Sequence, residues 1–144
     1  MKISAKTEYA CIAMLELASR YGSGEPVRIR KIAERHKVPP RFLVQILLQL
    51  KGAGLVASTR GAAGGYHLLK SPDNVSLGEV MDVIEGVSEG NGHTSSASPD
   101  SPAVKALLSA WQDINRVERE MLHGISFAQL LERAREQDEQ IYYI

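Results

Sequence analysis

The first seventy residues carry apolar side chains at the spacing of three helices. Over residues 4–21 these side chains recur every three or four positions, which predicts a helix that Ser4 caps at its start. A second helix is expected over about 29–36, and a third over about 39–52, where a Pro-Pro pair suits the first turn. Two short helices around a tight turn, after a longer supporting helix, are typical of a helix-turn-helix. We expect the third helix to bury five apolar side chains: Phe42, Leu43, Ile46, Leu47 and Leu50.

Two short runs of strand-forming residues follow the third helix and enclose a glycine-rich segment. Residues 55–59 and 66–69 are candidate strands, and the segment 60–65, Arg-Gly-Ala-Ala-Gly-Gly, joins them as a hairpin. Such a hairpin is ordinary by itself. Directly after a helix-turn-helix, with an arginine at its base, it predicts a wing that enters a minor groove of DNA. A nucleotide-binding loop is not expected, since the segment lacks the lysine of a P-loop and no helix opens after the glycines.

The second half of the chain predicts three more helices. Residues 76–84 form a helix that Ser76 caps, with Glu79 completing a capping box. A long helix is expected over about 103–123, and Ser126 with Gln129 caps a short helix after it. The long helix could fold back on its own chain, but its length and its place beyond a loop favour pairing with a second copy. Its apolar stripe, which we assign to dimerisation, comprises Leu107, Trp111, Ile114, Val117 and Met121.

These elements indicate a mainly α fold with a small β-hairpin wing, that is, a winged helix-turn-helix followed by a long dimerisation helix. We expect a DNA-binding domain at 1–85 and a Gly/Ser/Pro-rich loop at 86–102. The dimerisation helix and the short C-terminal helix then occupy 103–136, and an acidic and aromatic tail occupies 137–144.

The net charge of zero conceals two halves of opposite sign. Residues 1–70 hold twelve lysines and arginines against four glutamates, a net charge of +8, and residues 71–144 carry −8. This division favours a polyanion such as nucleic acid as the partner of the first half, although two ordinary solvated surfaces would give the same count.

Several classes of protein are not expected. No run of eighteen apolar residues and no signal-peptide pattern occurs, so we expect a cytoplasmic protein that does not enter a membrane. Cys11 is the single cysteine, which excludes an internal disulfide and a cysteine-rich metal site within one chain. The four histidines are scattered and no Ser/His/Asp set appears, so an enzyme is the least expected class.

Several short motifs stand out along the chain: Lys2-Ile3-Ser4, Glu8-Tyr9-Ala10, Gly54-Leu55-Val56 and the wing residues 60–66. The most specific is the wing sequence Arg-Gly-x-x-Gly-Gly-Tyr after Gly-Leu-Val. These motifs resemble those of the Rrf-two family of bacterial winged-helix repressors, and the resemblance covers nearly the whole chain. It implies a homodimer that binds an imperfect palindrome in double-stranded DNA and is associated with the bacterial nucleoid.

By this resemblance, the start of the third helix and the wing contact DNA. Arg41 can bind a phosphate or a guanine edge, Gln45 can bind adenine, and Arg60 suits a narrow minor groove. Val44 stands where some relatives have a base-reading glutamate, so it offers an apolar contact, such as one with a thymine methyl. Gln45 could instead be an ordinary solvent-facing residue. The resemblance implies eight DNA-binding residues: Arg28, Pro39, Arg41, Val44, Gln45, Arg60, Gly64 and Gly65.

Cluster-binding relatives have three cysteines in the loop before the long helix, and this chain has none there. Hydroxyl groups and one imidazole, His93, cannot hold an iron–sulfur cluster, so we expect no cluster and no metal. We expect Cys11 to pack as a small apolar residue. The chain is therefore similar to the cluster-free branch of the family, which contains the cysteine-metabolism repressor.

The last three residues, Tyr142, Tyr143 and Ile144, are closely similar to the ending of that repressor. In that branch cysteine synthase is the co-repressor, so the resemblance implies that these residues bind this enzyme. The tail could equally pack on its own dimer. We thus expect a repressor of cysteine or sulfur metabolism. The alternative is a protein-interaction adaptor whose winged helix no longer reads DNA.

Overall fold

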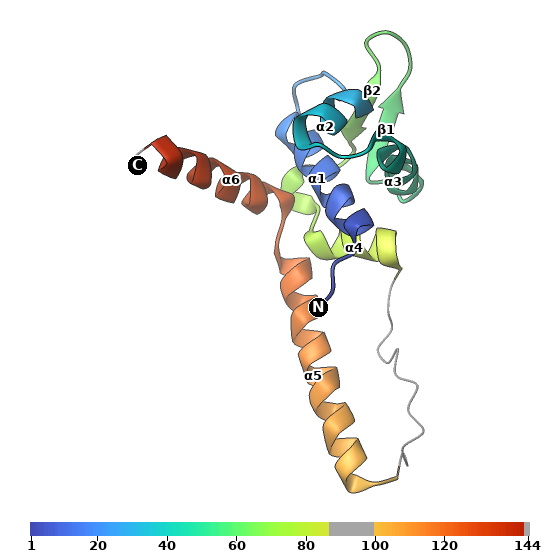
Figure 1. The fold of residues 1–144 in the computed structure, drawn as a ribbon, viewed down its shortest axis with the longest axis vertical. Helices are drawn as coiled ribbons and strands as arrows, with labels where there is room; N and C mark the ends of the chain where they lie inside the picture. Colours follow the sequence, from blue (N-terminus) through green and yellow to red (C-terminus); the bar gives the residue numbers. More distant parts are fainter. Residues whose placement is uncertain (87–99, 143–144) are drawn as a thin grey trace.

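The computed structural model describes residues 1–86 and 100–142. It is mostly helical with one antiparallel two-stranded sheet, which confirms the mainly α fold with a β-hairpin wing (Figure 1). The elements in chain order are α1 (Ala5–Ser19), α2 (Ile29–His36), α3 (Pro40–Gly52), β1 (Val56–Thr59), β2 (Gly65–Leu68), the 3-10 helix η1 (Pro72–Asn74), α4 (Leu77–Glu85), α5 (Pro102–Gly124) and α6 (Phe127–Tyr142).

Helix α1 is the central element of the folded body. The hydroxyl of Ser4 accepts a hydrogen bond from the amide of Thr7 at 3.1 Å, so it caps the helix as expected. Helices α2, α3, α4 and α6 and strand β2 all contact α1. Its buried side chains, together with those of α3 and the fully buried Phe127 of α6, form one apolar core. The burial of this shared core is what holds the short elements together.

The turn between α2 and α3 is tight. Lys37 ends α2 in the left-handed conformation, with φ 55°, which costs a non-glycine residue about 1 kcal/mol. The amide of Val38 donates to the carbonyl of Ala33 at 3.2 Å and thereby closes the turn. Helix α3 begins at Pro40 directly afterwards, so its orientation against α2 is set over three residues. This is the geometry of a helix-turn-helix.

The wing is joined to the start of α2 as well as to α3. Strands β1 and β2 pair antiparallel, with Val56 opposite Leu68 and Thr59 opposite Gly65. Val27, just before α2, exchanges two backbone hydrogen bonds with Tyr66, at 2.8 and 2.7 Å. The wing therefore extends from a base that is bonded to the helix-turn-helix, which fixes its direction.

The second half is anchored through the junction of α5 and α6. The amide of Leu77 donates to the carbonyl of Ile125 at 2.9 Å, and the amide of Phe127 donates to the carbonyl of Val75 at 2.9 Å. Helix α5 extends away from the body from this junction, on the side opposite the wing (Figure 1). No residue of this 23-residue helix is buried. It is an arm held at its C-terminal end.

Three details differ from the sequence-based expectations. Phe42 is 39% exposed, because it lies on the side of α3 that meets the edge of α1. Ser76 does cap α4, but the carboxylate of Glu79 bonds to Lys70 at 2.8 Å and not to the cap residue. The C-terminal helix is not short, since α6 runs over sixteen residues to Tyr142.

The longer α6 also changes the proposed domain boundary. Residues 137–142 continue this helix and do not form a separate tail, since the segment contains good helix formers and neither glycine nor proline. Most of the expected loop, residues 87–99, and the last two residues, Tyr143 and Ile144, lie outside the described residues. None of the helices in the described ranges is both long and apolar enough to span a membrane.

Candidate nucleic-acid interface

The residues expected to contact DNA lie at one end of the molecule. Helices α2 and α3 and the wing gather there, while α5 extends from the opposite end (Figure 1). The eight residues come from three places: Arg28 at the N-terminal cap of α2, residues 39–45 around the start of α3, and residues 60–65 in the wing. The fold therefore brings together segments that are separated in the sequence.

Helix α3 has two distinct faces. One face packs into the core through Leu43, Ile46, Leu47 and Leu50, all fully buried. The other face is exposed and mixes charged, amide and apolar side chains: Arg41, Val44, Gln45 and Leu48. Val44 is 45% exposed and Leu48, one turn later, is 56% exposed. Exposed aliphatic side chains beside an arginine and a glutamine suit the edges of bases in a major groove, where thymine presents a methyl group.

Leu48 was not among the expected contact residues, although its four-residue spacing from Val44 could have indicated it. The sequence also did not predict that Phe42 supports the side chain of Arg41. The guanidinium of Arg41 lies over the ring of Phe42, 5.2 Å from its centroid. That ring in turn packs on Tyr9 of α1, with centroids 5.8 Å apart. The stack restrains Arg41 before any ligand arrives, because a cation over an aromatic face is attracted to it.

The glycines of the wing shape its backbone. Gly65 has φ 153°, and a Cβ atom placed there would lie 2.5 Å from the carbonyl oxygen of Val27. Gly64 is buried, and a Cβ there would overlap the carbonyl of Thr59. These two positions let the hairpin close and approach α2. Their role in this structure is to place Arg60, which is exposed at the end of β1.

A buried carboxylate ties the helix-turn-helix to α1. Glu16 is only 4% exposed, and its two oxygens accept from Arg35 at 3.0 Å and contact the imidazole Nε2 of His36 at 3.1 Å. Both partners belong to the last turn of α2. Sequence patterns do not reveal this contact, since nineteen and twenty residues separate the partners. We call these contacts the Glu16 tie; they fix the end of α2, and so the start of α3, against α1.

Three arginines expected to contact DNA are available for a ligand. In the ranges that the structure describes, Arg28, Arg41 and Arg60 form no ion pair with a carboxylate. Arg35 and Lys70, by contrast, are paired with Glu16 and Glu79. Unpaired arginines at one end of the body match the charge and the geometry of phosphate and of guanine edges.

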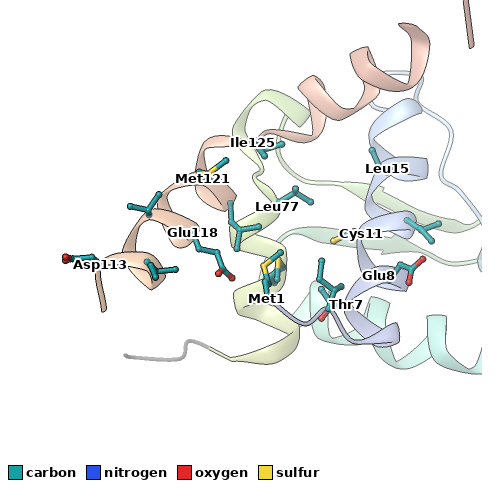
Figure 2. A pocket seen from close by; sticks show the side chains of 16 residues that line it. Met1, Thr7, Glu8, Cys11, Leu15, Leu77, Asp113, Glu118, Met121 and Ile125 are labelled. Carbon is teal, nitrogen blue, oxygen red and sulfur yellow. The ribbon is translucent and has the colours of Figure 1, made fainter. Parts of the chain in front are cut away.

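A second surface runs along α5. The expected dimerisation residues Leu107, Trp111, Ile114, Val117 and Met121 are all exposed, between 47% and 64%. Three of them, Ile114, Val117 and Met121, continue into an open apolar groove of about 830 Å³ between α1, α4 and α5. Figure 2 shows the side chains of these three helices around that groove. An apolar surface this long is unusual on a monomer and marks an interaction site.

Cys11 lies in this groove, half-buried on α1 (Figure 2). Burial and the nearby carboxylate of Glu85 raise the pKa of the Cys11 thiol to about 11. The thiol is therefore protonated at neutral pH, where only the thiolate would be a nucleophile or a metal ligand. It behaves as a small apolar side chain of the groove.

The chain matches known transcriptional regulators over most of its length. A model of the Rrf2 family, described as iron-dependent transcriptional regulators, matches residues 3–133. IscR of Aliivibrio salmonicida is 34% identical over 133 residues, which cover 91% of this chain and 77% of that protein. CymR of Bacillus subtilis is 42% identical over 86 residues, which cover 60% of this chain and 62% of CymR.

Solved structures show the same arrangement. The structure of CymR, the global cysteine regulator of B. subtilis, matches with a TM-score of 0.79 and 32% identity, covering 92% of this chain and 98% of that one. The structure of IscR from T. potens matches with a TM-score of 0.76 and 33% identity, covering 95% and 90%. The likeness thus includes the arm as well as the winged helix.

The family description names iron, but the chain has too few cysteines for an iron–sulfur cluster. Such a cluster is held by several thiolates, and the chain supplies one cysteine. Within residues 1–86 and 100–142, no three His, Cys, Asp or Glu side chains gather as a metal site would require. His93 of the expected loop lies outside those ranges.

Proposed function

Since this chain belongs to the Rrf2 family of transcriptional regulators, we propose that it represses transcription as a homodimer that reads an imperfect palindrome in DNA. Each protomer places α3 in a major groove and its wing in the adjoining minor groove. The observation that carries this proposal is the exposed face of α3 next to Arg28 and Arg60, which have no carboxylate partner among the described residues.

The dimer pairs through α5. The exposed stripe of α5 and the groove beside α1 form one continuous apolar surface, which supports a second copy as its occupant. Two copies related by a two-fold axis present the same surface to each other, so a single patch suffices for both. Pairing of this kind places two α3 helices at a fixed separation, as a palindrome requires.

The test of DNA binding is its salt dependence. Arg60→Ala should weaken binding to a selected operator about 10-fold and reduce the slope of log affinity against log salt by about one. Arg133→Ala, which removes an exposed arginine from α6, is the matched control and should change neither quantity. Weak binding whose affinity depends neither on salt concentration nor on duplex sequence would contradict the proposal. It would favour an adaptor that no longer reads DNA.

Val44 reads thymine through its methyl group in this account. Replacing the contacted thymines of the operator by uracil should weaken binding of the wild-type protein about 5-fold, because each substitution removes the methyl that Val44 covers. Val44→Ala should bind the thymine and uracil operators within about 2-fold of each other. Titrations of both proteins on both duplexes measure this difference, and equal sensitivity of the two proteins would contradict it.

The protein works without an iron–sulfur cluster. One cysteine per chain cannot supply the thiolates of a cluster, so the signal comes from elsewhere. Protein purified without oxygen should show no visible absorption band of a cluster, and an iron chelator should leave operator affinity unchanged. A chelator-sensitive affinity would overturn this part of the proposal.

The genes under control belong to cysteine or sulfur metabolism, and cysteine synthase is the co-repressor. The likeness to CymR, described as a global cysteine regulator, supports this assignment. Tyr142, Tyr143 and Ile144 would bind the enzyme; the last two lie outside the described residues. Full-length protein should bind the host's cysteine synthase, and deletion of Ile144 should abolish this binding without affecting the operator. Unchanged binding after the deletion would show that the tail is not the contact.

A further inference from the structure

A cluster of charged and polar side chains joins the arm to the body. Both oxygens of Asp82 on α4 accept from Arg119 on α5, at 3.0 and 2.9 Å. The imidazole Nε2 of His123, one turn further along α5, lies 3.2 Å from Oδ2 of Asp82. We call these three residues the Asp82 clasp. A forked arginine–carboxylate pair is directional as well as attractive, since both N–H groups must align with both oxygens.

The clasp is also shaped from the α4 side. A Cβ atom at Gly78 would lie 2.5 Å from the ring of His123, so the absence of a side chain at Gly78 lets the imidazole lie against α4. The imidazole can donate from Nε2 in its neutral or its protonated form. The hydrogen bond to Asp82 and the charge of its carboxylate raise the pKa of Arg119.

A small rotation of α5 at the clasp produces a large displacement at the far end of this helix. The backbone bonds at Leu77 and Phe127 hold only the end of α5, and the helix extends about 25 Å from Arg119 to Pro102 at 1.5 Å per residue. A change of about 10° at the clasp would move the far end of the arm by about 4 Å. This exceeds the rise of one base pair, about 3.4 Å. Contacts that limit this angle therefore limit which half-site spacing a dimer can match.

We propose that the Asp82 clasp fixes the angle between α5 and the winged-helix body and thereby sets the half-site spacing that the dimer reads. This inference rests on the proposed function, since it requires a dimer paired through α5. Asp82, Arg119 and His123 are positioning residues: they lie on α4 and α5, away from the face of α3, and act through the orientation of the two α3 helices. The clasp is thus a determinant of operator architecture and not of base sequence.

The test compares operators that differ only in spacing. Three duplexes carry the same half-sites, which are those enriched by the wild-type protein. In one duplex the half-sites have the enriched spacing, and in the other two the segment between them is one base pair longer or one base pair shorter. The wild-type dimer should bind the duplex of enriched spacing at least about 10-fold more tightly than the other two duplexes. On those two duplexes, a rigid dimer cannot place both of its winged helices on their half-sites at once. Asp82→Asn and Arg119→Gln should reduce this preference to about 3-fold or less, while both variants remain dimers in sedimentation.

Arg116→Gln is the matched control. It removes an arginine of the same helix whose ion pairs, with Asp113 and Glu120, stay within α5, so the spacing preference should equal that of the wild type. Gly78→Ala disturbs the clasp in a second way, since it displaces His123 without removing a charge. The variant should fold, because alanine favours a helix, and it should lose part of the spacing preference.

The outcomes separate the two proposals. If the wild-type protein enriches no operator or forms no dimer, the proposed function fails and this inference fails with it. If the wild-type protein prefers one spacing and the clasp variants keep that preference, only the role of the clasp is overturned. Monomeric clasp variants would also overturn it, since the three residues would then serve assembly and not orientation.

Discussion

Ile114→Glu should convert the dimer into folded monomers and lower operator affinity at least about 100-fold. Ile114 is 60% exposed at the centre of the α5 stripe and lines the groove, so folding of one chain does not depend on it. Dimer formation would bury two copies of the new carboxylate in apolar surroundings, which costs several kcal/mol without a partner (about 3 or more). A monomer holds one half-site alone and loses the advantage of linked binding, about 10²- to 10⁴-fold.

Gln112→Glu is the control for this variant. It adds the same charge to α5 at an exposed position on the side of the helix away from the stripe, so mass and operator affinity should remain those of the wild type. Sedimentation equilibrium gives the mass, circular dichroism gives the fold, and a titration gives the affinity. A dimeric Ile114→Glu protein with wild-type affinity would remove α5 from the interface.

Gly65→Ala should destabilise the protein by about 3 kcal/mol and impair DNA binding as well. The new methyl group would lie 2.5 Å from the carbonyl of Val27, a backbone atom that cannot rotate away, at a residue with φ 153°. Relief of this overlap requires the two hydrogen bonds between Val27 and Tyr66 to lengthen or break. The wing would then lose its fixed direction relative to α2.

Gly61→Ala separates backbone strain from overlap. Gly61 has φ 104° in the same hairpin, but no atom lies within 4 Å of an added Cβ, so only the strain of about 1–2 kcal/mol applies. Urea unfolding of both variants gives the two free energies of unfolding. Equal losses would contradict the view that the close approach of Gly65 to Val27 is what joins the wing to α2.

Local rules predicted much of the fold, because helix caps and periodicity depend on near neighbours. Ser126 and Gln129 were expected to cap the last helix, and both reciprocal hydrogen bonds are present, at 3.0 and 3.1 Å. Glu79 followed the same pattern at α4 but bonds to Lys70, nine residues away in the sequence, since that lysine lies within reach in the folded chain. A motif indicates which bonds are possible, and tertiary contacts select among them.

The parts that sequence could not predict depend on contacts between distant elements. Periodicity placed Phe42 in the core, but Tyr9 and Arg41 hold it at the surface. The Glu16 tie and the Asp82 clasp join residues at least nineteen positions apart, and no spacing rule reaches that far.

In the proposed function, three parts of the molecule act together. The end that carries α3 and the wing would bind DNA, α5 would pair with a second copy, and the Asp82 clasp joins α5 to α4. The Glu16 tie fixes α2 against α1, and the backbone hydrogen bonds between Val27 and Tyr66 fix the wing against the start of α2. Contact residues that are ordered before DNA binds lose less conformational entropy on binding, and this raises the affinity for DNA.

The most direct test of the central claim is the affinity of the wild-type protein for the sequence that it enriches from genomic fragments, compared with a scrambled duplex of equal length at physiological salt. We predict an enriched sequence with two-fold symmetry, bound at least about 10³-fold more tightly than the scrambled duplex. Equal affinity for the two duplexes, or no enriched sequence, would contradict the claim that this chain is a sequence-specific DNA-binding dimer.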